Sequence, residues 1–116
     1  MKRVAITGPE STGKSSLASE LARIFNTVWV PEFARDYLVQ LSRPYGESDI
    51  LKIAEGQLIA EEQYFLKANQ IVFCDTDFLV TYIWSQVKYG RCDSWIEKKL
   101  SEHRYDLYLL CNIDLP

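Results

Sequence analysis

The sequence of 116 residues contains little cysteine and almost no histidine. Its three cysteines, Cys74, Cys92 and Cys111, are odd in number and form no Cys-x-x-Cys spacing. This pattern disfavours a disulfide framework and a zinc site. Cys74 and Cys111 stand in apolar runs, which predicts that they are small core residues. The single histidine, His103, lies in the polar stretch 101–104, so we expect it on the surface and not in catalysis.

Long apolar runs and basic clusters are also missing. No stretch reaches the roughly 18 apolar residues of a membrane span, and Met1 leads into a short strand pattern instead of a signal peptide. The formal net charge is -3 with no cluster of Lys and Arg, which is untypical of a nucleic-acid binder. We therefore expect a cytoplasmic protein that contacts neither a membrane nor nucleic acid. Its 47% hydrophobic content is enough for the core of one domain, residues 1–116.

Predicted strands and helices alternate along the chain. Short apolar runs predict strands at 2–7, 28–30, 71–74 and 106–111. Apolar residues at spacings of three and four predict helices from 14 onward and at 33–41, 49–69, 78–89 and 94–103. Nearly continuous apolar runs are typical of strands that are covered on both faces. The pattern predicts an α/β fold, a three-layer α/β/α sandwich with a parallel sheet.

A phosphate-binding loop follows the first predicted strand. The motif G-x-x-x-x-G-K-[ST] is matched in full by Gly8, Pro9, Glu10, Ser11, Thr12, Gly13, Lys14 and Ser15. In such a loop the backbone N–H groups and the helix N-terminus bind phosphate, the lysine reaches the β- and γ-phosphates, and the hydroxyl coordinates Mg²⁺. We expect ATP and Mg²⁺ here, with Ser16 beside them, and the predicted sandwich is then that of a P-loop NTPase. A Gly-rich turn with a surface lysine is the alternative, and the flanking strand and helix disfavour it.

Two charged side chains follow the second predicted strand, where ligands of parallel sheets bind. Glu32 is a candidate general base that accepts a proton from a substrate hydroxyl. Alternatively, it is only a first-turn residue that favours the helix dipole. Arg35 is a candidate for holding a substrate phosphate or hydroxyl, with a structural role as the alternative.

Two aspartates follow the third predicted strand. A carboxylate at Asp75 can bind a Mg²⁺-coordinated water or a ribose hydroxyl. Asp77 is expected to cap the next helix, and direct contact with the substrate is the alternative. The predicted sets are Lys14, Glu32 and Asp75 for catalysis, Glu32, Arg35, Asp75 and Asp77 for the substrate, and Ser15 and Asp75 for the metal.

Taken together, these motifs make the chain resemble the ribosylnicotinamide kinase domain of bacterial NadR-type proteins and related P-loop kinases. The matching segments are 8–15, 30–37, 54–57, 73–77 and 105–111. The resemblance implies an ATP-dependent kinase that phosphorylates the ribose 5′-hydroxyl of nicotinamide riboside in NAD biosynthesis. It also implies that Lys14 and Ser15 serve ATP and Mg²⁺, and that longer relatives carry fused NAD-metabolism or regulatory domains.

The sequence departs from that family at two places. Pro31 stands where the family often has an aromatic residue, so the stacking partner of the nicotinamide must come from elsewhere, with Phe33 and Tyr64 as candidates. In the family, an arginine-containing lid and a last helix and strand follow a stretch like 112–116. We therefore expect a fold truncated after the fourth strand, and weak ATP binding and slow turnover by residues 1–116 alone.

The alternative to a small-molecule kinase is a P-loop ATPase or a nucleotide-sensing regulatory module. An AAA-type ATPase usually carries Asp-Glu after an apolar strand, whereas this strand ends in Asp75-Thr76. A GTPase would need an Asn-Lys-x-Asp motif, and the sequence contains none. A nucleotide sensor fused to a DNA-binding domain remains open, although the acidic balance argues against contact between this segment and DNA.

Overall fold

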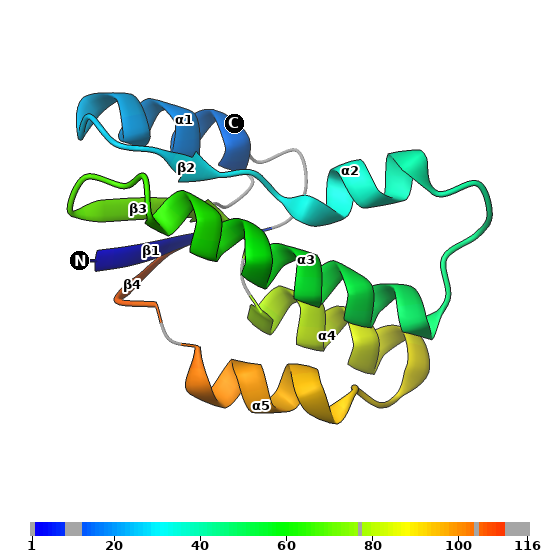
Figure 1. The fold of residues 1–116 in the computed structure, drawn as a ribbon. Helices are drawn as coiled ribbons and strands as arrows, with labels where there is room; N and C mark the ends of the chain where they lie inside the picture. Colours follow the sequence, from blue (N-terminus) through cyan, green and yellow to red (C-terminus); the bar gives the residue numbers. More distant parts are fainter. Residues whose placement is uncertain (1, 9–12, 77, 104, 111–116) are drawn as a thin grey trace, which may run out of the picture.

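The computed structural model describes residues 2–8, 13–76, 78–103 and 105–110. Within these residues, parallel strands alternate with helices (Figure 1). The strands are β1 (Lys2–Thr7), β2 (Trp29–Val30), β3 (Ile71–Asp75) and β4 (Leu107–Leu110). The helices are α1 (Lys14–Ile24), α2 (Phe33–Gln40), α3 (Glu47–Phe65), α4 (Phe78–Tyr89) and α5 (Ser94–Glu102).

The strands form one parallel sheet in the order β2-β3-β1-β4. β1 lies in the interior and pairs with β3 on one side and with β4 on the other. The register places Ile6 of β1 opposite Asp75 of β3. The segment after β1 and the last residue of β3 therefore meet at the same edge of the sheet, where open parallel sheets bind ligands.

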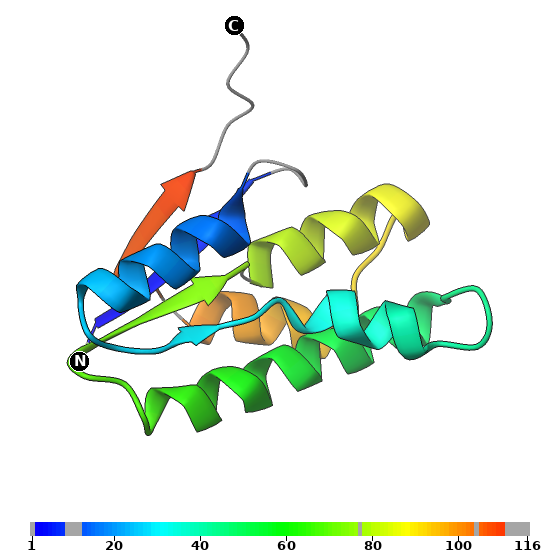
Figure 2. The same cartoon turned by 90° about the horizontal axis from the view of Figure 1, so that it is seen from above.

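Helices cover both faces of this sheet (Figure 2). Val4 and Ile6 point to the α1 side and pack with Ala18 and Ala22. Ala5 points to the other face and belongs to the cluster that α3 covers. This alternation follows from the two-residue period of a strand. The predicted three-layer α/β/α arrangement is confirmed.

A further hydrophobic cluster lies where α3, α4 and α5 pack together beyond the sheet (Figure 1). Its buried members are Ile50 and Ala54 of α3, Phe78 of α4 and Ile96 of α5. Because α4 follows β3 in the chain, this helical region adjoins the carboxyl edge of the sheet. In the part of the chain that the structure describes, no helix combines the length and the apolar character needed to cross a membrane.

The bounds of α3 differ most from the prediction of 49–69. The helix begins two residues earlier because the Asp49 carboxylate accepts a hydrogen bond from the Gly46 N–H at 2.7 Å, which closes the first turn. It ends at Phe65 because the N–H groups of Lys67 and Ala68 bond to carbonyls three residues back. Gln70 then takes a positive φ of 66° as the chain enters β3.

The cysteine prediction is confirmed at Cys74, whose side chain is fully buried in β3. Cys111 lies outside the described residues. The prediction for His103 is wrong. Its side chain is only 10% exposed, and Nε2 lies 2.7 Å from Oε1 of the buried Glu61. A buried carboxylate requires polar partners. His103 is such a partner for Glu61, although the two residues are 42 positions apart in the sequence.

Candidate active site

The phosphate-binding loop begins and ends in described backbone at Gly8 and Gly13. The predicted contacts of Pro9, Glu10, Ser11 and Thr12 lie outside the described residues. Gly13 has a φ of 81°, in the left-handed region that favours glycine, and it starts α1. The first turn of α1 carries no acidic residue, and the Gly13 position provides no side-chain cap. No side chain at Gly13 therefore competes with an anion for the first N–H groups of α1.

The Lys14 ammonium meets the predicted base at the start of α2. Lys14 Nζ lies 3.7 Å from Glu32 Oε2, and the two side chains are only 7% and 16% exposed. Nη2 of Arg35 lies 3.9 Å from the same oxygen. The structure thus brings these three residues together from two elements, and it places the Glu32 carboxylate between two cations.

Ser15 and Asp75, the predicted metal ligands, are in direct contact. The Ser15 hydroxyl donates to Asp75 Oδ2 at 2.6 Å. Arg35 Nη1 donates to Ser15 Oγ at 3.2 Å, so Arg35 bridges the pair and Glu32. Ser16 follows on α1 and is exposed.

The second carboxylate oxygen of Asp75 indicates whether a cation fits this position. Asp75 is fully buried, and its Oδ1 has no hydrogen-bond partner among the described residues. Leaving a buried polar atom unpaired costs free energy. A hydroxyl and a carboxylate are oxygen ligands of the kind that Mg²⁺ prefers. The donor set of Ser15 and Asp75 therefore fits a divalent cation.

Strained backbone follows Asp75. Thr76 is β-branched and has a φ of 102°, which is rare for such a residue. A hydrogen bond from the Thr76 N–H to the carbonyl of Ile6 at 2.9 Å holds this conformation against β1. Strain of this kind clusters at functional sites. The predicted roles of Asp77 lie outside the described residues.

A cavity of about 490 Å³ opens beside Lys14 and Glu32. Its polar part is formed by Gly8, Lys14, Glu32 and Arg35. Its apolar part is formed by Ala34, Leu38, Val80 and Trp84. The cavity therefore combines charged groups at the sheet edge with a hydrophobic wall contributed by α2 and α4.

Sequence reasoning missed Trp84 because an aromatic residue on an apolar helix is typical of the core. Its indole is held in place: Nε1 donates to the Tyr45 hydroxyl at 3.1 Å, and the rings pack edge-on with centroids 5.2 Å apart. The two predicted stacking candidates do not line this cavity. Phe33 packs against Gly56 of α3, and Tyr64 packs in the cluster between α3 and the sheet.

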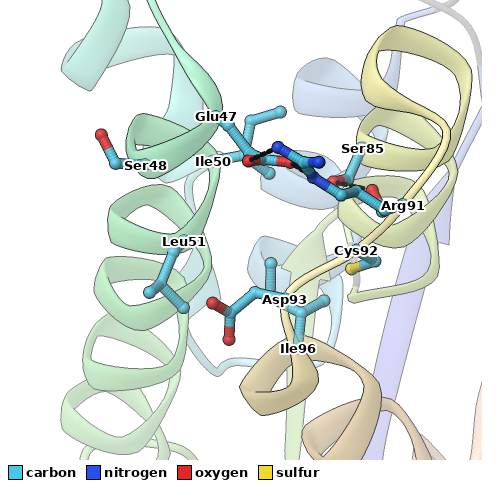
Figure 3. Close-up of a pocket in the computed structure, with 9 residues that line it drawn as sticks. All are labelled: Glu47, Ser48, Ile50, Leu51, Ser85, Arg91, Cys92, Asp93 and Ile96. Carbon is cyan, nitrogen blue, oxygen red and sulfur yellow. Dashed lines mark hydrogen bonds and ion pairs between the residues drawn. The ribbon is translucent and has the colours of Figure 1, made fainter.

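A second cavity, of about 310 Å³, lies between α3, α4 and α5 (Figure 3). Arg91 and Glu47 form a two-point ion pair across it, with N–O distances of 2.6 and 2.8 Å. Burial raises the pKa of the Cys92 thiol, so the nucleophilic thiolate is disfavoured there. None of the residues predicted for phosphate transfer lines this cavity. The candidate active site is therefore the cavity beside Lys14.

Known proteins resemble this chain in sequence and in fold. A family model described as AAA domain matches residues 3–116. Over its whole length the chain is 34% identical to the Trifunctional NAD biosynthesis/regulator protein NadR of Escherichia coli (strain K12), of which it spans 29%. It superposes on a NadR protein in complex with NR with a TM-score of 0.85, and on one in complex with NAD and AMP-PNP with a TM-score of 0.81. In both comparisons the sequence identity is 30%, and the match covers 94% of this chain and 33% of the NadR chain.

Proposed function

This chain belongs to the AAA domain family and is homologous to part of NadR, and from that premise we propose that it is the ATP-binding part of a nucleoside kinase. The proposed reaction transfers the γ-phosphoryl group of ATP to the ribose 5′-hydroxyl of nicotinamide riboside. One observation carries the proposal: Lys14, Glu32 and Arg35 line one cavity, beside the contact between Ser15 and Asp75. The chain spans about a third of the NadR structures.

The nucleotide end of the proposed site is built by the loop and α1. The N-terminus of α1 and the Lys14 ammonium would bind the phosphates. Ser15 and Asp75 would hold Mg²⁺, which when bound withdraws charge from the transferring group. The solved NadR complex with NAD and AMP-PNP supports a nucleoside triphosphate as the ligand.

The acceptor end of the proposed site is the Glu32 carboxylate. The acceptor hydroxyl oxygen forms a bond to the γ-phosphorus, the bond from that phosphorus to the bridging oxygen breaks, and ADP leaves. The hydroxyl proton passes to Glu32, which lies in the cavity at the required edge of the sheet. Arg35 is placed to bind the acceptor hydroxyl or the transferred phosphate, because it already contacts both Glu32 and Ser15.

The apolar wall of the cavity matches an acceptor that carries a flat ring. Aromatic side chains bind planar rings and cations through their faces, and the nicotinamide of its riboside is both planar and positively charged. Pro31 precedes Glu32, so the position directly before Glu32 offers no aromatic side chain. We assign the stacking role to Trp84 of α4, which lines the cavity. The NadR complex with NR supports this acceptor class.

The cavity also favours a kinase over the alternative P-loop ATPase or nucleotide-sensing module. An ATPase needs room only for a water molecule next to the γ-phosphate. Here a cavity of about 490 Å³ with a hydrophobic wall lies next to Lys14, which suits an organic acceptor.

The arginine-containing lid and the cytoplasmic location stay predictions.

The test uses the full-length protein in which this sequence occurs. We expect Mg²⁺-ATP to raise the melting temperature of the wild type, since a ligand at 100 times its Kd stabilises by about 2.7 kcal/mol. Lys14→Ala should lose this shift and the transfer of labelled phosphate to nicotinamide riboside. Lys52→Ala, which removes an exposed lysine on α3, should change neither. Hydrolysis of ATP by the wild type without phosphate transfer to any nucleoside would favour the ATPase alternative.

A further inference from the structure

We propose that Gln57 is a positioning residue that accepts a hydrogen bond at the start of α2 in place of Glu32, and that the Glu32 carboxylate therefore extends toward Lys14 at the active-site cavity. The inference rests on the proposed function, in which Glu32 accepts the proton of the substrate hydroxyl. It follows from contacts between α2, α3 and the segment that leads into β4.

The start of α2 lacks the usual cap. Glu32 is its N-cap residue, with φ −68° and ψ 111°, but its side chain accepts no hydrogen bond from the helix. That side chain extends to Lys14 instead, at 3.7 Å. The first N–H groups of a helix need an acceptor from outside the helix. The Phe33 N–H finds one in Gln57 Oε1, at 3.0 Å from the facing helix α3.

Another helix of the same chain shows the ordinary arrangement. At α5 the N-cap residue is Asp93, and its own carboxylate accepts a hydrogen bond from the Trp95 N–H at 2.8 Å. An acidic N-cap residue can therefore cap its own helix in this protein. At α2, by contrast, the side-chain acceptor is Gln57, which binds the N–H of the first helical residue, and Glu32 contacts the phosphate-binding lysine.

The orientation of the Gln57 amide is set by its second partner. Gln57 is 2% exposed, and its Nε2 donates to Glu61 Oε2 at 3.1 Å. A carboxylate oxygen accepts hydrogen bonds, so the NH₂ group must face Glu61. The amide oxygen is then left to face the Phe33 N–H. Glu61 therefore determines which end of the amide reaches α2.

Glu61 is held from three sides. The Tyr105 hydroxyl donates to its Oε2 at 2.6 Å, and Nε2 of His103 lies 2.7 Å from Oε1. Nε of Arg3 on β1 lies 4.0 Å from the same Oε1. These contacts tie the carboxylate to β1 and to the segment between α5 and β4. The cap of α2 is therefore fixed relative to the sheet, and the sheet also positions Lys14.

Gln57→Leu tests the proposal in the full-length protein. We expect turnover to fall roughly 10- to 100-fold, because a displacement near 1 Å of a reacting group can cost about that much, while the KM for ATP stays within about twofold. Hydrogen exchange of the Phe33 amide should become faster. The matched control is Gln63→Leu, which changes an exposed glutamine on the same helix and should alter neither measurement.

A reciprocal exchange separates positioning from general packing. Gln57→Glu alone places two carboxylates side by side in the core and should impair turnover. Adding Glu61→Gln restores a donor–acceptor pair with an oxygen still facing the Phe33 N–H, so turnover should recover at least about tenfold over Gln57→Glu. This comparison also decides the matter if Gln57→Leu fails to fold.

The proposal is overturned if the wild type transfers phosphate and Gln57→Leu retains its turnover, or if the reciprocal exchange brings no recovery. Unchanged Phe33 exchange in Gln57→Leu would overturn the cap itself. A wild type that transfers no phosphate would contradict the proposed function instead, and the exchange rate of Phe33 would then decide alone whether Gln57 caps α2.

Discussion

The Ser15 hydroxyl donates a hydrogen bond to Oδ2 of Asp75 at 2.6 Å, although 60 residues separate the two in sequence. The contact forms because β1 and β3 are parallel neighbours and both end at the same edge of the sheet. It joins the first turn of α1 to the last residue of β3. The other oxygen of Asp75 is buried without a hydrogen-bond partner among the described residues, so this carboxylate has capacity for one more ligand.

Asp75→Asn tests that capacity. Asparagine keeps an oxygen that can accept from Ser15, but it removes the negative charge that a divalent cation requires. We expect turnover of the full-length protein to fall about 100-fold, since metal stabilisation of the transition state is worth several kcal/mol. The Mg²⁺ concentration that gives half-maximal activity should rise.

The same substitution should leave the melting temperature without nucleotide unchanged or higher, because a buried negative charge with one oxygen lacking a partner among the described residues no longer has to be accommodated. Loss of activity together with a large loss of stability would indicate a structural role for Asp75. Turnover within about threefold of the wild type would remove Asp75 from the metal site.

Trp84→Ala tests the apolar wall. Stacking of one base on an aromatic side chain contributes about 1–3 kcal/mol by alanine substitution. We expect the KM for nicotinamide riboside to rise about tenfold or more, while the KM for ATP stays unchanged. Trp84→Phe should keep most of the affinity. The comparison variant Trp95→Phe changes a tryptophan that packs on Phe78 away from this cavity, so a rise in KM there would argue against a specific role for Trp84.

Asp49 predicts how stability responds to acid. Its buried carboxylate accepts from Arg43, the Tyr37 hydroxyl and the Gly46 N–H. These hydrogen bonds, that of Arg43 first, hold the pKa of Asp49 well below its ordinary value of 3.8. A carboxyl whose pKa is lower in the folded state stabilises the fold above the unfolded pKa, and the stabilisation is lost as the pH falls below it.

The measurement is the free energy of unfolding in urea between pH 6 and pH 2. We expect Asp49→Asn to be less stable than the wild type near neutral pH, and to lose less stability on acidification below about pH 4. Asp36→Asn, at an exposed position on α2, should follow the wild-type curve. Parallel curves for Asp49→Asn and the wild type would contradict the assignment.

Gly56→Ala tests the contact between α2 and α3. A Cβ atom at this position would overlap the ring of Phe33. Alanine improves helix propensity by about 1 kcal/mol, but overpacking costs about 1–3 kcal/mol. We therefore expect a net loss of up to about 2 kcal/mol in unfolding free energy. In a Phe33→Leu background the same change should be less costly, and an equal cost in both backgrounds would show that Phe33 is not the cause.

The phosphate-binding loop and the strand-end carboxylates could be predicted because their signals are local. The motif through Ser15 carries its own spacing, and apolar runs mark the strands after which Glu32 and Asp75 stand. The parallel topology follows from the alternation of strands and helices. With those two steps, Glu32 and Asp75 were expected at the edge of the sheet where the structure places them.

The partners of buried polar groups could not be predicted in this way. Nothing around His103 in the sequence signals Glu61, because the contact depends on how α3 and the end of α5 pack. Trp84 looked like a core residue, since the helix that carries it is apolar on several sides. Phe33 was a stacking candidate next to Glu32. Its ring packs on α3 instead, because Gly56 has no side chain and leaves room for it.

By itself, the sequence determined the candidate groups for phosphate chemistry: a lysine, a hydroxyl and carboxylates placed by short-range patterns at the ends of strands. Only the tertiary structure decided how those groups are held and what lies opposite them. The Trp84 wall and the Gln57 cap depend on packing between segments far apart in the chain. Residue spacing encodes local backbone geometry, whereas such contacts arise from the joint burial of several helices.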